Sequence, residues 1–129
     1  MLRINLEIDV GLHRGGFNLN ELELALTFVR DHQHLDFSCF RGYEPHVAAL
    51  PEMFGWQKSS LLDAWSIYRK AIDLVDNRLG SSAINKATRN AAGSKTYRFY
   101  EHTSIANELS IGSALVKPSG FDDPLLEDY

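Results

Sequence analysis

Histidine, cysteine and carboxylate side chains are the groups of this 129-residue chain that could move protons, attack a substrate or bind a metal. Nucleophilic catalysis needs a serine or cysteine beside a histidine base, and the chain holds one cysteine, Cys39, and five histidines. Cys39 falls in a segment with the alternation of a buried strand, where a free thiol packs as a small apolar group. No motif joins it to a base, so we assign no catalytic residue. The histidines are His13, His32, His34, His46 and His102.

The densest histidine cluster is the run from Asp31 to Asp36, which holds two imidazoles and two carboxylates. Such groups bind zinc and other divalent cations. The spacing of His32, His34 and Asp36 resembles the HxHxD core of the metallo-β-lactamase fold over five residues, but Phe37 stands where that family has a further histidine. We therefore predict an exposed helix end with two ordinary histidines, no bound metal and no other cofactor.

Two glycine-containing segments place a histidine near an arginine. His13–Gly16 precedes a predicted helix, where backbone N–H groups could bind an anion. It lacks the Lys-Ser/Thr pair of a P-loop and the spaced glycines of a dinucleotide fingerprint, which favours a flexible connection. Arg41 and His46 have an RxxxxH spacing that resembles the HEPN-type ribonucleases, but Gly42 and Pro45 oppose the helix that this arrangement requires. We interpret the second segment as a loop with an ordinary histidine.

Charge is distributed unevenly along the chain, whose formal net charge is -4. Residues 69–98 carry 7 basic and 2 acidic side chains, whereas the segments before and after them are acidic. Cations interleaved with rings can bind single-stranded nucleic acid by contacting phosphates and stacking on bases. A pI near 5.7 is low for such a binder, which favours neutralisation by the acidic flanks. The candidate residues for binding nucleic acid or a partner are Arg78, Lys86, Arg89, Lys95, Tyr97, Arg98 and Tyr100.

The first half of the chain has clear local patterns. Alternating apolar and polar residues predict a half-buried antiparallel strand over residues 3–10. Asn18, with Glu21 three residues later, predicts a capped helix that extends to about His32. A second strand is predicted over residues 35–40, and a helical turn or two around 46–50, where flanking prolines prevent a longer helix.

The strongest pattern in the sequence is an apolar stripe that predicts a long helix from about Ser60 to Leu79. Packing against the sheet accounts for one side of this helix. Leu62, Ile67 and Leu74 widen its apolar surface, and we predict that they mediate self-association as a homodimer. The stripe consists of Leu61, Trp65, Tyr68, Ile72, Val75 and Leu79.

Patterns after Gly80 are weaker. Small residues predict a short helix from Ser81 or Ser82 to Ala92, and the aromatic run 95–101 predicts a strand. Residues 103–116 fit either a capped helix or a strand, of which the strand is favoured. Residues 118–129 are acidic and predicted to be irregular.

Together these patterns predict one α+β domain over residues 1–129, with a small, mostly antiparallel sheet packed on the long helix and one or two shorter helices. The lack of a catalytic or cofactor motif favours a non-enzymatic module that binds a protein partner, of the inhibitor, immunity or adaptor type. A nucleic-acid-binding protein is the alternative, and a small enzyme that uses a histidine comes third. A single cysteine and the lack of any apolar window of membrane-spanning length predict a cytoplasmic protein without membrane contact.

Overall fold

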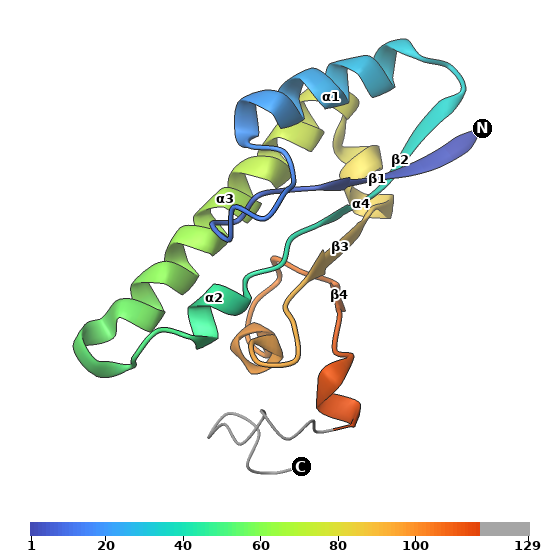
Figure 1. Ribbon diagram of the computed structural model, residues 1–129. Helices are drawn as coiled ribbons and strands as arrows, with labels where there is room; N and C mark the ends of the chain where they lie inside the picture. The colour runs from blue at the N-terminus through green and yellow to red at the C-terminus, as the bar shows by residue number, and fades with distance from the viewer. Residues whose placement is uncertain (117–129) are drawn as a thin grey trace.

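The computed structural model describes residues 1–116, which form a parallel sheet with helices packed on one of its faces (Figure 1). The four strands lie in the order β1 (Leu2–Glu7), β2 (Leu35–Arg41), β3 (Thr88–Ala91) and β4 (Glu108–Leu109). Every neighbouring pair is parallel. The predicted α+β fold with a mostly antiparallel sheet is therefore wrong, and the chain has an α/β architecture.

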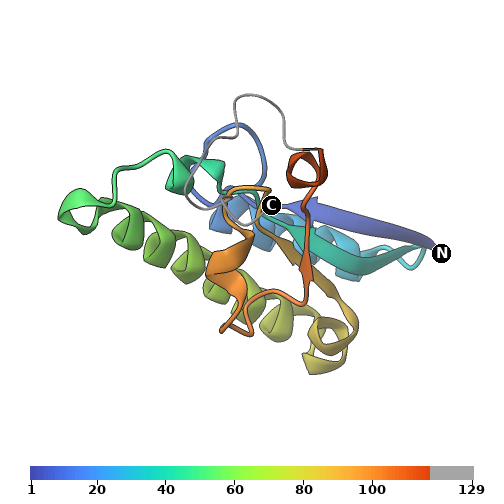
Figure 2. The ribbon, with the colours of Figure 1, turned by 90° about the horizontal axis from the view of Figure 1, so that it is seen from below.

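The strand direction was mispredicted because apolar–polar alternation shows only which face of a strand is exposed to solvent. It carries no information about whether the neighbouring strand runs parallel or antiparallel. Leu6 and Ile8 are buried whereas Asn5 and Glu7 are exposed, so β1 alternates although it pairs with β2 in parallel. Seen from below, the long helix α3 lies on one side of the strands, and no helix of similar length lies on the other side among the described residues (Figure 2).

Helix α1 (Leu19–Asp31) connects β1 to β2 and packs against α3 (Trp56–Leu79) on the apolar face of the sheet. The predicted cap of α1 is confirmed. The Asn18 side chain accepts hydrogen bonds from the N–H groups of Asn20 and Glu21, and the Glu21 carboxylate accepts one from the Asn18 N–H. This reciprocal arrangement satisfies backbone donors that a helix start otherwise leaves unpaired.

The connection from β2 to β3 contains most of the helical residues. It passes through α2 (Pro45–Ala48) and η1 (Met53–Gly55), then through α3, and ends with α4 (Ser81–Lys86). Helix α3 begins at Trp56, earlier than the predicted Ser60, and ends before Gly80 as predicted. Among residues 1–116, no helix combines the length and apolar character that a bilayer span requires.

The C-terminal third differs from its predicted elements. The helix predicted up to Ala92 consists of α4 and then β3, and the strand predicted over 95–101 is the 3-10 helix η2 (Tyr97–Tyr100). Residues 103–116 hold the two-residue strand β4 and η3 (Ser113–Leu115). The sequence of β3 has no apolar–polar alternation. The segment is a strand because it pairs with β2 on one side and with β4 on the other. The predicted irregular segment 118–129 lies outside the described residues.

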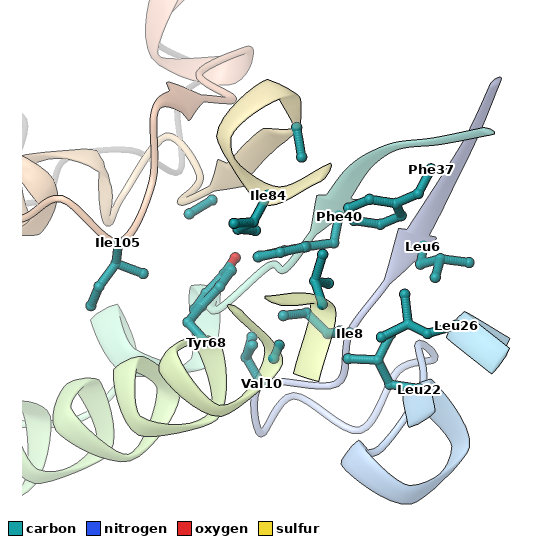
Figure 3. Close-up of a cluster of buried hydrophobic side chains, with 14 of the residues drawn as sticks. Leu6, Ile8, Val10, Leu22, Leu26, Phe37, Phe40, Tyr68, Ile84 and Ile105 are labelled. Atoms are coloured by element: carbon teal, nitrogen blue, oxygen red, sulfur yellow. The ribbon is translucent and has the colours of Figure 1, made fainter. Parts of the chain in front are cut away.

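The core lies between the sheet and the two long helices (Figure 3). Leu22 and Leu26 of α1 meet Phe40 of β2 and Tyr68 of α3, and all four side chains are fully buried. The Tyr68 hydroxyl donates a hydrogen bond to the Asn90 carbonyl at 3.1 Å, which ties α3 to β3. Three residues of the predicted stripe of α3, Leu61, Tyr68 and Val75, are buried, whereas Trp65, Ile72 and Leu79 are half-buried and pack against the core.

Candidate functional site

The carboxyl ends of parallel strands meet at one edge of a sheet, and α/β proteins bind their ligands at this edge. In this chain β1 and β2 run away from the N-terminus toward the loops that precede α1 and α2 (Figure 1). Loops 8–18, 42–44 and 92–96 follow β1, β2 and β3 at this edge. We call the polar side chains of these loops and of the first turn of α2 the carboxyl-edge site: Asp9, His13, Arg14, Tyr43, Glu44 and His46.

Asp9 organises the loop that follows β1. Its Oδ1 atom accepts hydrogen bonds from the N–H groups of Gly11 and His13, both at 3.0 Å, and its Oδ2 atom lies 2.7 Å from His13 Nδ1. Burial opposes ionisation of Asp9, but the hydrogen bonds from His13 and Gly11 outweigh it and keep the pKa below its ordinary value. Asp9 is therefore a carboxylate that holds the exposed His13 at the edge of the sheet.

His46 lies in the first turn of α2, next to the Asp9 loop. A Cβ atom on Gly11 would come within 3.2 Å of His46 Nε2, so the imidazole packs directly on the Gly11 backbone. Its Nδ1 atom is buried and has no hydrogen-bond partner within residues 1–116. Burial lowers the pKa of His46, the charge of His13 lowers it further, and the Asp9 carboxylate opposes both. The imidazole is therefore neutral at pH 7.

Tyr43 connects the loops after β1, β2 and β3. The Arg14 guanidinium lies over its ring, 4.9 Å from the centroid, as in a cation–π contact. On the other loop, a Cβ atom on Gly93 would come within 2.6 Å of the Tyr43 ring, so glycine permits this close approach. Arg14 also lies 3.6 Å from a Glu7 carboxylate oxygen. The guanidinium is thereby held at the edge of the sheet.

Glu44 lies beneath this surface and is fully buried. Its Oε1 atom accepts a hydrogen bond of 2.9 Å from the Thr96 hydroxyl, which in turn accepts one from the Gly93 N–H. Burial raises the pKa of Glu44 to about 7, although the hydrogen bond from Thr96 opposes the shift. Sequence reasoning missed both residues, because Glu44 lies in a loop without hydrophobic periodicity and Thr96 lies in the run 95–101, which was interpreted as a strand from its aromatic residues.

Strained backbone occurs at two positions of these loops. His13 and Ala92 have φ angles of 54° and 63°, in the left-handed region that residues other than glycine rarely adopt. Such strain persists only where surrounding contacts impose it, and it concentrates at functional sites. Both residues lie at the carboxyl edge, which adds an independent reason to place the functional site there.

The basic and aromatic residues named from the sequence do not gather on one surface. Lys86 lies at the amino edge, just before β3, and Lys95 follows the carboxyl end of the same strand. Tyr100 is buried, and Arg98 packs near the Tyr97 ring within η2. The set is therefore divided between opposite edges of the sheet.

Two further arginines of this set have structural contacts. The Arg89 guanidinium donates to the Ile105 carbonyl at 3.1 Å and reaches two further carbonyls at 3.5 Å, which fixes the segment before β4. Arg78 forms an ion pair with Glu23 and links α3 to α1.

The other residues named from the sequence lie away from the carboxyl edge. Leu62 is 47% exposed on α3, whereas Ile67 and Leu74 are half-buried and pack against the core. His32 and His34 are exposed at the amino edge. Within residues 1–116 no three histidine, cysteine or carboxylate side chains gather in a way that could hold a metal ion.

No protein-family model and no curated protein sequence matches this chain. Its fold is similar to part of solved alanine racemases, with TM-scores of 0.57 for the enzyme from Corynebacterium glutamicum, 0.61 for that from Oenococcus oeni and 0.53 for that from E. faecalis. The identities are 17%, 18% and 19%, and the matches cover 86%, 88% and 88% of this chain. They cover 28%, 28% and 27% of the racemases, so the chain spans less than a third of their length. The likeness concerns the fold.

Proposed function

We propose that the carboxyl-edge site binds a small amino acid and that His46 exchanges a proton with it. The observation that carries this proposal is the neutral His46 imidazole next to the Asp9–His13 pair, at the sheet edge where α/β proteins bind ligands. The fold likeness supports the ligand class, because the solved structures that share the fold are alanine racemases. Binding of a small amino acid thereby replaces binding of a protein partner as our leading proposal.

The side chains of the site have complementary roles in this proposal. The His46 imidazole accepts a proton from the ammonium group of the bound amino acid, whose nitrogen keeps the bonding pair as a free amine, and the Asp9 carboxylate favours the imidazolium that forms. The Arg14 side chain is 60% exposed, and its guanidinium can pair with the carboxylate of an amino acid in place of the long contact to Glu7. The site thus offers a cation for the substrate carboxylate and a base for a proton.

The test compares His46→Asn with His34→Asn, a matched change of an exposed histidine at the opposite edge. Addition of L- or D-alanine should shift the His46 imidazole signals in NMR spectra of the unmodified chain. The affinity for alanine, measured by calorimetry, should be about tenfold lower in His46→Asn, which lacks the imidazole, and unchanged in His34→Asn. Failure of either enantiomer to shift the His46 signals, or equal affinity for alanine in both variants, would contradict the proposal.

Binding of a protein partner is a second candidate function, favoured by exposed apolar side chains at the start of α3. Met53, Phe54 and Trp56 are 68%, 79% and 55% exposed, and the two rings lie 5.6 Å apart. Exposed apolar groups gathered in this way often mark an interaction surface. Replacement of Phe54 and Trp56 by serine should abolish co-purification of a defined partner, whereas Leu24→Ser, an exposed change on α1, should not. Equal recovery with both variants would exclude this surface.

We propose a cytoplasmic location, on the basis of the single cysteine. Cys39 is buried on β2, and burial raises the pKa of its thiol, which keeps it protonated. A chain with one buried thiol gains nothing from an oxidising compartment, where small proteins depend on disulfides. Fractionation of cells that produce the chain should recover it with cytoplasmic markers, and recovery from an exported fraction would contradict this.

A further inference from the structure

Arg14 is the cation that the proposed function assigns to the carboxylate of a bound amino acid, and two contacts hold it at the carboxyl edge. Its guanidinium lies 4.9 Å from the centroid of the Tyr43 ring and 3.6 Å from a Glu7 carboxylate oxygen. A ligand carboxylate would take the place of Glu7, so the Tyr43 ring is the contact that remains in the bound state. The residues that fix this ring therefore fix the binding position of Arg14.

The Tyr43 ring is supported from below by a series of contacts that ends at Glu44. The ring packs on Gly93, where a Cβ atom would come within 2.6 Å of it. The Gly93 N–H group donates a hydrogen bond of 2.9 Å to the Thr96 hydroxyl, which donates one of 2.9 Å to Glu44 Oε1. Because Glu44 directly follows Tyr43 in the chain, its side chain ties the loop after β3 to the loop that carries the ring.

The loop after β3 is strained next to this series of contacts. Ala92 has a φ angle of 63°, and its N–H group faces the Glu44 carboxyl group. A residue other than glycine keeps such a conformation only where the surrounding contacts impose it. Release of the Glu44 side chain would relieve this strain, which favours opening of the loop.

The surroundings of the Glu44 side chain favour a neutral carboxyl group over a carboxylate. The side chain is fully buried, its Oε2 atom has no hydrogen-bond partner within residues 1–116, and it forms no ion pair among them. The other groups that face it are the Thr96 hydroxyl, the Tyr100 hydroxyl of η2 and the Tyr68 hydroxyl of α3. Burial raises the pKa of both tyrosines, so neither carries a charge. A charge on Glu44 would therefore be uncompensated as long as the side chain stays buried.

We propose that Glu44 is a positioning residue for Arg14. While its carboxyl group is protonated, it holds the loops after β2 and β3 together and keeps the guanidinium over the Tyr43 ring. When the proton is lost to solvent, the uncompensated charge and the strain at Ala92 open the loop after β3, and Arg14 loses its contact with the ring. This inference rests on the proposed function, because it concerns the cation that would bind the carboxylate of the amino acid.

The pKa of Glu44 determines the direction of the effect. Burial raises this pKa to about 7 in the closed arrangement. Chains in which Glu44 is protonated keep Arg14 in place, so the affinity for an amino acid should fall as pH rises through about 7. Between pH 6 and pH 8 the fall should be about tenfold at most, the limit for the loss of one proton. Glu44→Gln keeps an acceptor for the Thr96 hydroxyl and cannot ionise, so it should lack this fall.

NMR spectra of the chain without ligand test the position of Arg14 directly. Protons that lie over an aromatic face resonate upfield. The Arg14 Hδ signals of the unmodified chain should therefore be shifted upfield at pH 6 and return toward ordinary values at pH 8, whereas Glu44→Gln should keep the upfield shift at both. Signals that do not change between pH 6 and pH 8 in the unmodified chain, or that change equally in Glu44→Gln, would overturn the proposal.

Variants of Thr96 distinguish positioning from a general loss of structure. Thr96→Val removes the hydroxyl that joins Glu44 to Gly93, so it should lose the upfield shift at pH 6 and bind alanine about tenfold more weakly. Thr96→Ser keeps a hydroxyl and should behave like the unmodified chain. Thr27→Val, which removes a hydroxyl hydrogen bond within α1, is the matched control and should change neither measurement. Thr96→Val with the Arg14 signals of the unmodified chain would contradict the proposal, and if this variant does not fold, the comparison with Glu44→Gln still decides.

Calorimetry with alanine at pH 6 and pH 8 measures the consequence for binding. The loss of affinity between these pH values should be larger in the unmodified chain than in Glu44→Gln, since all other titrating groups are common to both. Equal losses would show that Glu44 does not act on Arg14. The Arg14 signals are read without ligand, so failure of alanine to bind at pH 6 contradicts the proposed function, while these signals still decide the role of Glu44.

Discussion

The Glu44 carboxyl group occupies a buried position of the kind that most proteins fill with an apolar side chain or a water molecule. It follows a strand that ends at Arg41, and a charged residue in such a position is usually exposed. Here the chain turns back under Tyr43, and the Glu44 side chain points inward to Thr96. The residue thus connects the loop after β2 to the loop after β3 from below, and its protonation affects both.

The first prediction concerns the pH dependence that Glu44 imposes. Because its pKa rises from 4.5 to about 7 on folding, the folded state binds this proton more tightly than the unfolded state. The free energy of unfolding should therefore fall as pH rises from about 4.5 to 7, by about 3 kcal/mol from this group. Glu44→Gln keeps an acceptor for the Thr96 hydroxyl but does not titrate, so it should lack this decline.

Urea denaturation of both proteins between pH 4 and pH 8 measures this difference. Other groups titrate in both proteins and cancel when the two curves are subtracted. His46 is one of them: its lowered pKa makes stability rise with pH, opposite in sign to Glu44. A difference between the two proteins that stays constant over this pH range would show that water reaches the Glu44 carboxyl group.

His13 and His46 could be named from the sequence, but their proximity could not. They are separated by α1 and β2, and only the parallel pairing of β1 with β2 brings the loops after both strands to one edge. An antiparallel pair would have placed the two loops at opposite ends. The candidate site was therefore missed because strand direction, which is set by the crossover through α1, was wrong.

Among the helices and strands, α1 has the start that depends most on a few neighbouring residues, those of its N-terminal cap. Asn18 provides two hydrogen bonds to backbone N–H groups, each of 3.0 Å. Asn18→Ala removes both and should destabilise the protein by about 1 kcal/mol, within the usual range of about 0.5 to 2 kcal/mol for such caps. Asn20→Ala, an exposed change in the first turn, is the matched control because no side-chain hydrogen bond is lost. Equal midpoints in urea for the two variants would show that the cap contributes nothing.

Elements with strong periodicity were predictable, and those fixed by their neighbours were not. The period of α3 and the cap of α1 are encoded over a few successive residues, so the sequence predicted both helices. Thr88–Ala91 contains no apolar alternation, and it is a strand because β2 and β4 flank it. The aromatic run at Tyr97–Tyr100 suggested a strand, yet it forms a 3-10 helix with Tyr100 buried beside Trp65.

At the scale of the whole molecule, the helices and the candidate site occupy different sides of one sheet. Helices α1 and α3 cover the apolar face, and the site lies at the carboxyl edge of the sheet. The core therefore positions the loops without contributing to the surface that a ligand would meet. Substitutions of the exposed site residues His13 and Arg14 should change ligand binding with little effect on the stability of the ligand-free chain.

The last prediction follows from this separation. A ligand that binds only the folded state stabilises it by about 2.7 kcal/mol when its concentration is one hundred times the dissociation constant. For a chain of this size that free energy corresponds to a rise of roughly 10 °C in the thermal midpoint. Alanine should produce such a rise in the unmodified chain and in His34→Asn, and a much smaller one in His46→Asn or Arg14→Ala. Betaine, which has no primary amine, reveals any general osmolyte effect. A rise of equal size with betaine, or in all four proteins, would show that alanine does not bind at the carboxyl edge.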